Sequence, residues 1–187
     1  MTLEDMKIKV YTMIEEYDSD SETLTTDPDY ASKFNSITNQ IQNELTRFKK
    51  INDYTTEEVE KDDVINLQDI DTNFYQLKII RGVKYEIIGD RVKFLEDGTA
   101  EIYYTKTPTR IDINTSDSYE FELSDDLLEI MPYGIAGDLL KSDVSNQYGS
   151  VYYARYQELR NALDPRYTDT TIEFDGGVEA WVKQVVA

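Results

Sequence analysis

Residues 124–165 read SDDLLEIMPYGIAGDLLKSDVSNQYGSVYYARYQELRNALDP. Each half carries apolar residues at helical spacing, and the polar residues 145–149 separate the two halves. Ser124 and Asp125 are suited to cap the first helix, and Pro165 ends the second. The stretch therefore predicts a helical hairpin.

Small residues and a proline lie inside the first helix of this hairpin. Pro132 lacks an N–H and clashes with the preceding turn, so we expect it to kink or restart the helix. Gly134, Ala136 and Gly137 follow closely, and each glycine costs up to ~1 kcal/mol relative to alanine in a helix. We therefore expect another backbone to pack against this point.

The composition excludes several classes of function. The 187 residues fit one domain, or one domain that carries a smaller insertion. No Cys and no His is present, which removes disulfides, thiolate metal sites and the commonest general base. Most catalytic chemistry is thereby excluded, and we expect no enzyme activity, no cofactor and no metal.

The charge of the chain disfavours nucleic acid and membrane partners. Acidic residues outnumber basic ones 38 to 19, for a formal net charge of −19. Such a surface repels DNA phosphates, yet it suits a wall past which DNA slides without sticking. No apolar run approaches the roughly 20 residues of a membrane span, and the N-terminus lacks a signal-peptide pattern. We expect the protein in a cytoplasm-like compartment.

Two helices are predicted before residue 54. The first covers residues 3–17, with Thr2 as cap and Asp5 completing a capping box. The second covers residues 28–50, with Asp27 as cap and Pro28 at its first position. The face opposite its apolar stripe is rich in Asn and Gln, which favours a subunit contact slightly over bulk solvent.

The chain between these helices and the hairpin is rich in strands. Residues 55–63 are acidic and are interpreted as a linker or capped turn. Short β-branched and aromatic runs follow at 64–67, 74–80, 83–88, 91–95, 99–105, 111–113 and 119–123. Gly89-Asp90 marks one turn, and Asp97-Gly98 predicts a hairpin between the runs on either side of it.

Helices before and after a run of strands favour an α+β fold. We expect a helical bundle of two N-terminal and two C-terminal helices, an inserted small antiparallel β-domain and an extended C-terminal tail. The boundaries are 1–53 and 124–165 for the helical core, 54–123 for the β-domain and 166–187 for the tail. The tail is interpreted either as an edge strand on its own domain or as an arm that binds a neighbour, anchored by Trp181.

Acidic clusters were considered as metal or catalytic sites. Residues 112–123 resemble a calcium loop only faintly, because the sixth position is not Gly and Leu123 stands where a bidentate Glu belongs. Glu57, Glu58 and Glu60 have no spacing that demands a carboxylate pair, so a solvated face is the preferred interpretation.

The phrase PYGIAGDLLKSDVSNQYG at residues 132–149, the Tyr and Arg positions at 153–156 and LDPR at 163–166 resemble the head–tail connector proteins of long-tailed bacteriophages. These adaptor, or head-completion, proteins are structural virion proteins. The resemblance is specific over about 36 residues, 131–166, and architectural elsewhere. It is strongest to the connectors of phages that infect low-GC Gram-positive hosts.

The resemblance implies an oligomeric ring, commonly a dodecamer, beneath the portal protein in the neck of the virion. The ring extends the channel through which DNA passes without specific binding, and it is a docking platform for the next neck or tail-completion protein. Assembly takes place in the host bacterial cytoplasm, without a membrane. The helical core is expected at the subunit interface, through Tyr133, Gly134, Gly137, Tyr148, Tyr152, Tyr153 and Tyr156, and the portal-binding tail would use Ile172, Phe174, Val178, Trp181 and Val182.

For each of those tyrosines, plain packing within one subunit is as good an explanation as a ring contact. Three interpretations of the whole chain stay open on the residues alone. The structural connector comes first, and an α+β scaffold or a module that binds a peptide or small ligand without catalysis comes second. A carboxylate-dependent hydrolase is the third.

Overall fold

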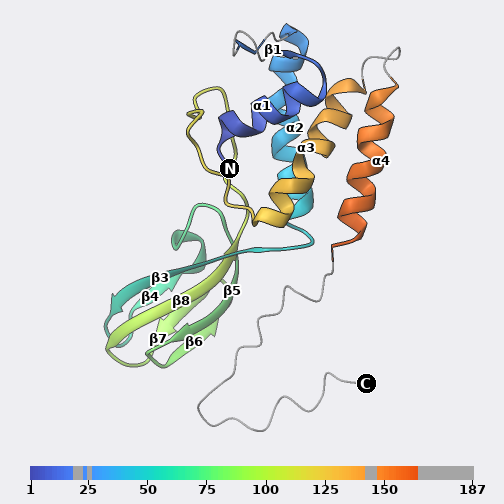
Figure 1. Cartoon of the computed structure of the whole chain (residues 1–187). Coiled ribbons are helices and arrows are strands. Elements are labelled where there is room, and N and C mark those ends of the chain that lie inside the picture. The colour runs from blue at the N-terminus through green and yellow to red at the C-terminus, as the bar shows by residue number, and fades with distance from the viewer. Residues whose placement is uncertain (19–22, 25–26, 142–146, 164–187) are drawn as a thin grey trace, which may run out of the picture.

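The computed structural model describes residues 1–18, 23–24, 27–141 and 147–163, which form an α+β fold (Figure 1). The helices are α1 (Leu3–Met13), α2 (Pro28–Leu45), α3 (Asp125–Leu140) and α4 (Tyr148–Asn161), with a 3-10 turn η1 (Leu67–Asp69). The strands are β1 (Tyr17–Asp18), β2 (Thr23–Leu24), β3 (Ile51–Val59), β4 (Val64–Asn66), β5 (Phe74–Arg81), β6 (Tyr85–Ile88), β7 (Arg91–Phe94) and β8 (Gly98–Lys106).

The starts of the first two helices confirm their predicted caps. Thr2 Oγ1 accepts a hydrogen bond from the Asp5 amide at 3.1 Å, and the Asp5 carboxylate accepts one from the Thr2 amide at 2.8 Å. Asp27 accepts from the Asp29 amide at 2.9 Å at the start of α2. The predicted end at residue 50 is wrong, because α2 stops at Leu45 and the chain enters β3 at residue 51.

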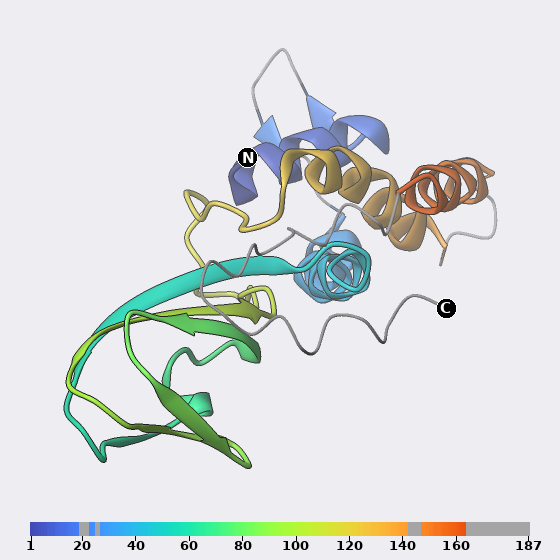
Figure 2. The same ribbon diagram turned by 90° about the horizontal axis from the view of Figure 1, so that it is seen from below.

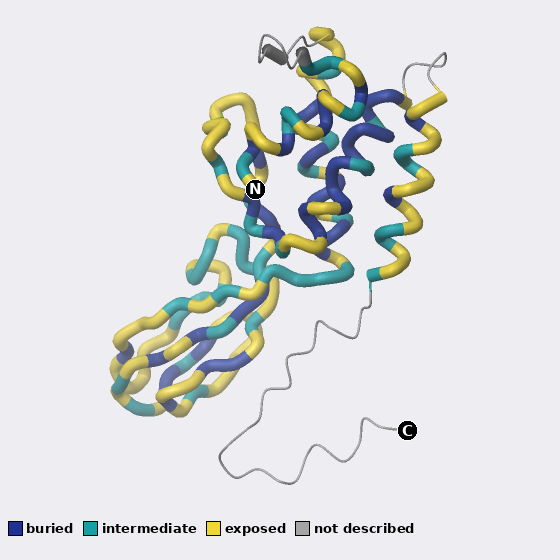
Figure 3. Tube along the Cα trace, in the orientation of Figure 1, coloured by how far each residue is buried: buried dark blue, intermediate teal, exposed yellow. Residues whose placement is uncertain are grey.

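The helices pack around α3, which is buried on almost every side (Figure 3). Its residues Met131, Ile135 and Leu139 join side chains of α1, α2 and α4 in one apolar core. The helix continues through Pro132 without a break, so the predicted restart at this residue is wrong. Within the described part of the chain, no helix combines the length and the apolar character that crossing a bilayer requires.

The β strands form two three-stranded antiparallel sheets, with the orders β3-β8-β5 and β4-β7-β6. Side chains from both sheets, among them Val59, Val92, Phe94 and Ile102, share a second apolar core. The helical core and this β core use separate residues, and Figure 2 shows the β unit set to one side of the helices. The β-rich stretch of the sequence thus builds a sheet pair with its own interior.

Two local predictions in the β unit are wrong. The acidic residues 55–63 are no linker, since most of them belong to β3, which pairs with β8 over its whole length. The turn Asp97-Gly98 joins no hairpin, because β7 pairs with β4 and β6 while β8 pairs with β3 and β5. The Gly89-Asp90 turn does connect paired strands, β6 and β7. In each wrong case the deciding contact is a distant strand.

The stretch after β8 differs from its prediction as well. Residues 111–123 were expected to contain strands, but the described chain has only an isolated bridge there, between Thr2 and Glu120. Ile111, Phe121 and Leu123 are nevertheless buried in the helical core. Their apolar alternation therefore serves packing against helices.

Candidate functional site

The α3–α4 hairpin, where the sequence places the subunit interface, is closely packed within one chain. A Cβ added to Gly137 would lie 2.9 Å from the backbone nitrogen of Tyr153, and one added to Gly134 would lie 3.0 Å from both Ile41 and Tyr156. The two glycines thus let α4 approach α3 at distances that a side chain would prevent.

Three of the seven predicted interface residues are consequently occupied inside the subunit. Tyr156 is fully buried and packs in the helical core, where its ring lies beside Gly134. Burial raises the pKa of its hydroxyl, and the Glu44 carboxylate adds to that effect. Gly134, Gly137 and Tyr156 therefore offer no surface to a partner in the single chain.

The other four predicted residues lie at or near the surface. Tyr148 is 65% exposed, whereas Tyr133, Tyr152 and Tyr153 are half-buried. The Tyr152 hydroxyl donates a hydrogen bond to the Met13 carbonyl at 2.6 Å, which ties α4 to the end of α1. The Tyr153 ring lies beneath the Lys141 ammonium, 5.5 Å from it.

The outward side of α4 carries a regular row of exposed residues, of which only Tyr148 was expected at a subunit contact. Tyr148, Val151, Arg155 and Glu158 are exposed at 3-4-3 spacing, and we call these four residues the α4 outer face. Val151 is 60% exposed, and Arg155 pairs with Glu158 at 2.7 Å. The row could not be predicted because Tyr152 and Tyr156 supply an equally apolar stripe one step around the helix.

The predicted portal-binding residues, Ile172, Phe174, Val178, Trp181 and Val182, lie outside the described residues.

The polar face of α2 has its partner in the same chain. Asn39 donates to the Ile111 carbonyl at 2.7 Å and accepts from the Ile111 amide at 2.9 Å. Gln42 donates to the Thr109 carbonyl at 3.0 Å, and Asn35 donates to the Asp112 carbonyl at 2.9 Å. These three side chains therefore satisfy backbone groups of residues 109–112 within the chain. The expected subunit contact of this face stays a prediction.

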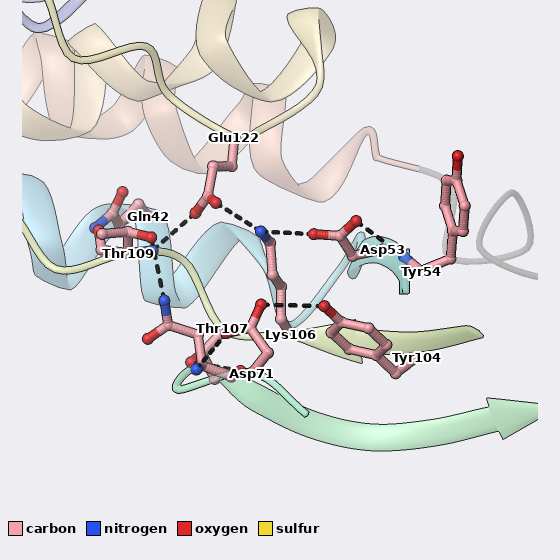
Figure 4. Close-up of polar contacts among 10 residues, drawn as sticks. Gln42, Asp53, Tyr54, Asp71, Tyr104, Lys106, Thr107, Thr109 and Glu122 are labelled. Carbon is pink, nitrogen blue, oxygen red and sulfur yellow. Dashed lines mark hydrogen bonds and ion pairs between the residues drawn. The ribbon is translucent and has the colours of Figure 1, made fainter. Parts of the chain in front are cut away.

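A polar cluster joins the helical and β units at the end of β8 (Figure 4). The Lys106 ammonium contacts the Asp53 carboxylate at 2.8 Å and the Glu122 carboxylate at 2.7 Å. Glu122 also accepts from the Thr109 amide at 2.9 Å. The Tyr104 hydroxyl donates to Asp71 at 3.1 Å. We call Lys106, Asp53 and Glu122 the joint triad.

The ionisation of the joint triad follows from its pairing. Burial works against the charge on Lys106, but hydrogen bonds and charge from Asp53 and Glu122 outweigh it and raise the pKa of the ammonium. Burial also opposes the charge on Asp53, yet the Lys106 contact and the Tyr54 amide hold the pKa of that carboxyl below its usual value. Burial raises the pKa of the nearby Tyr104 to about 12. The cluster is thus a charged contact between the two units.

The outer face of the β3-β8-β5 sheet carries aromatic and cationic side chains. The rings of Tyr54 and Tyr103 stack at 5.6 Å, and the Arg81 guanidinium lies 5.4 Å from the centre of the Tyr103 ring. A shallow cavity of about 220 Å³ opens beside them, lined in part by Lys78 and Ile79. This surface could not be predicted from the sequence, because its residues come from three strands that lie apart in the chain.

Carboxylates gather in a second shallow cavity of about 220 Å³ between β3 and β4, lined by Glu57, Glu58, Asp63 and Asp69. Glu58 accepts from the Thr99 hydroxyl and Asp63 from the Glu60 amide, so two of the four serve local structure. The Asp112 carboxylate likewise accepts from the Asn114 amide at 2.8 Å within its own turn. Across the described ranges, no three acidic side chains are placed to hold a metal ion.

Comparison with family models finds no match to this chain, and comparison with curated proteins finds no significant similarity.

Proposed function

We propose that this chain is a structural virion protein, a head-to-tail adaptor that forms an oligomeric ring beneath the portal of a long-tailed phage. In this proposal the ring extends the DNA channel and is the docking platform for the next neck or tail-completion protein. Its place is the neck of the virion, after assembly in the host cytoplasm.

The observation that carries the proposal is the α4 outer face. A helix at the margin of a helical bundle normally turns its apolar residues inward and its polar residues to solvent. Here α4 packs on α3 through Gly149 and Tyr156, and it still presents Tyr148 and Val151 on the opposite side. Aromatic and apolar residues exposed in register on one helix are typical of a surface that a partner covers.

The resemblance to connector proteins falls on this same hairpin. Several of its residues have a role within the subunit that the structure makes explicit, such as Gly134 and Gly137 at the α3–α4 contact. These contacts fix the orientation of α4 on the rest of the molecule, and hence the direction in which Val151 points. A rigidly held outer helix supports a ring, because each subunit must meet the next at one constant angle.

The charge of the chain supports the passage of DNA. With 38 acidic against 19 basic residues, the surface repels phosphate, and transient contact with DNA costs little to break. In the proposal, the tail residues Ile172, Phe174 and Trp181 attach the ring to the portal.

A second candidate function is a non-catalytic binding module. The cavity beside Tyr103, with Arg81 and Lys78 at its rim, favours an anionic ligand with a flat apolar part. A module of this kind needs no ring, so a native mass of about twelve subunits favours the adaptor.

The test is co-purification with a portal ring. The full chain is produced together with the portal protein of its own phage, the complex is isolated through a tag on the portal, and its mass is measured under native conditions. We expect about one adaptor per portal subunit, and loss of capture when residues 166–187 are deleted. Absence of the full chain from the isolated portal, in a preparation where it is folded and abundant, contradicts the proposal.

A further inference from the structure

The last strand of the larger sheet has a free edge. In the order β3-β8-β5, strand β5 bonds to β8 on one side, and within the described residues no strand pairs with its other side (Figure 1). Backbone N–H and C=O groups along such an edge can pair with one more extended segment.

This edge is positively charged, which is unusual for so acidic a chain. Strand β5, FYQLKIIR, contains Lys78 and Arg81 and no carboxylate. Neither cation has a carboxylate within ion-pair distance among the described residues. Glu101 stands opposite Arg81 in the register, but its carboxylate accepts the Tyr103 hydroxyl at 3.0 Å. The β5 edge is therefore suited to an acidic segment and repels a basic one.

A series of contacts leads from the end of α4 to the start of β5. Arg160, in the last turn of α4, pairs with Glu44 near the end of α2, and its guanidinium lies 5.8 Å from the Phe48 ring. Two residues further on, the Lys50 ammonium lies 4.4 Å from the ring of Tyr75 in β5. The end of α4 and the beginning of β5 are thus linked through the short stretch between α2 and β3.

The residues that follow Leu163 include a segment whose chemistry suits this edge. Residues 171–175, TIEFD, alternate apolar and polar side chains as a strand does. Between Arg166 and Lys183 the sequence has four acids and no base.

We propose that residues 171–175 bind the free edge of β5 in the same chain, as the fourth strand of that sheet. In this proposed pairing Glu173 and Asp175 face the side of the sheet on which Lys78 and Arg81 line one cavity, and Ile172 and Phe174 face the β core. The lysine and arginine make the edge selective, because they disfavour neutral or basic strands and attract this acidic one.

The proposed binding concerns the isolated protein and needs no portal.

Amide hydrogen exchange of the full chain, read by mass spectrometry, tests the proposal. We expect the peptide that covers residues 171–175 to exchange at least about tenfold more slowly than an unstructured segment of that sequence. Replacing both cations, Lys78→Glu with Arg81→Glu, should remove this protection. The control is Lys9→Glu with Arg91→Glu, two exposed cations without an ion pair, which changes the net charge equally and should leave protection intact.

A charge exchange completes the design. Adding Glu173→Lys and Asp175→Lys to the Lys78→Glu, Arg81→Glu variant should restore protection, because the two sides then carry opposite signs again. Exchange of residues 171–175 at the unstructured rate in the unmodified chain overturns the proposal, as does protection that survives the Lys78→Glu, Arg81→Glu change. Protection that vanishes on dilution overturns binding within one chain.

The outcome is independent of the test of function. If the proposal fails while capture by the portal succeeds, the adaptor role stands and the tail is free before docking. If capture fails while residues 171–175 are protected, the edge binding stands and the adaptor role is lost.

Discussion

The side chain of Asn39 pairs with the backbone of a residue far away in the sequence. Its amide group donates to the Ile111 carbonyl and accepts from the Ile111 amide, as the backbone of a neighbouring strand would. The helical periodicity of α2 identified this face as polar. It could not identify the partner, because Ile111 lies 72 residues away and contributes only backbone groups to the contact.

Replacement of Asn39 by aspartate should destabilise the protein although the shape of the side chain is kept. A carboxylate still accepts from the Ile111 amide, but it has no N–H to donate and faces the Ile111 carbonyl with like partial charge. We expect a loss of about 1–3 kcal/mol in the free energy of unfolding, measured by urea denaturation at pH 7.

Asn43→Asp is the matched control, since Asn43 donates only to the Asn39 carbonyl of its own helix and is exposed. A change within about 0.5 kcal/mol is expected there. Equal losses of unfolding free energy in the two variants would show that the contact between α2 and residues 109–112 stabilises the fold no more than an exposed side chain does.

Helix prediction succeeded where the deciding contacts are local. The caps at Thr2 and Asp27 and the apolar stripes indicate where the first two helices begin and which faces they bury. Strand pairing failed where the contacts are distant, as at Asp97-Gly98, whose turn chemistry fits a hairpin although its two strands belong to different sheets. At Pro132 the expected restart of the helix is wrong too, because α3 continues through this residue inside the apolar core.

The glycines of α3 allow a test of the α3–α4 contact. A methyl group at position 137 meets the backbone of Tyr153 at 2.9 Å, which cannot move without moving α4. At position 134 the obstacles are the side chains of Ile41 and Tyr156, at 3.0 Å. Gly137→Ala should therefore lower the unfolding free energy by about 1–3 kcal/mol.

Gly134→Ala is the comparison within the same helix. It gains up to ~1 kcal/mol of helix propensity, as Gly137→Ala does, but displaces only side chains. We expect it to be the milder substitution in thermal and urea denaturation. The close-packing account is contradicted if Gly137→Ala is the milder of the two.

At the scale of the whole molecule, the joint triad connects the helical and β units. Lys106 is 13% exposed, with Asp53 and Glu122 at 37% and 24%. Replacing it by methionine leaves two carboxylates facing each other, which should cost about 1–3 kcal/mol at pH 7, less than a fully buried pair because both acids reach water.

The pH dependence of this loss has a defined sign. The raised pKa of Lys106 means that its contribution is complete below pH 10.5 and is lost as the pH rises further. The lowered pKa of Asp53 means that its contribution is present above pH 3.8 and is lost as the pH falls further. The difference in unfolding free energy between the unmodified protein and Lys106→Met should thus be largest near neutral pH and smaller at both extremes of pH.

Taking this difference between two proteins removes the effect of the tyrosines, whose own ionisation also destabilises the fold at high pH. Urea denaturation from pH 3 to pH 11.5 measures it, with Lys84→Met as the control for an exposed pair. A difference in unfolding free energy that stays constant over this pH range would show that the joint triad stabilises the fold through packing rather than charge.

The central claim for the whole molecule is that the α4 outer face joins subunits of a ring. Val151→Asp adds a charge to this face at a 60% exposed position, so the fold should lose no more than about 0.5 kcal/mol. Ser32→Asp, at an exposed position of α2, adds the same charge elsewhere.

The native mass of the portal complex formed by each of these variants is the most direct test. The unmodified chain and Ser32→Asp should give a portal with a full complement of about twelve adaptors, and Val151→Asp a portal with few or none. A full complement with Val151→Asp would contradict the account.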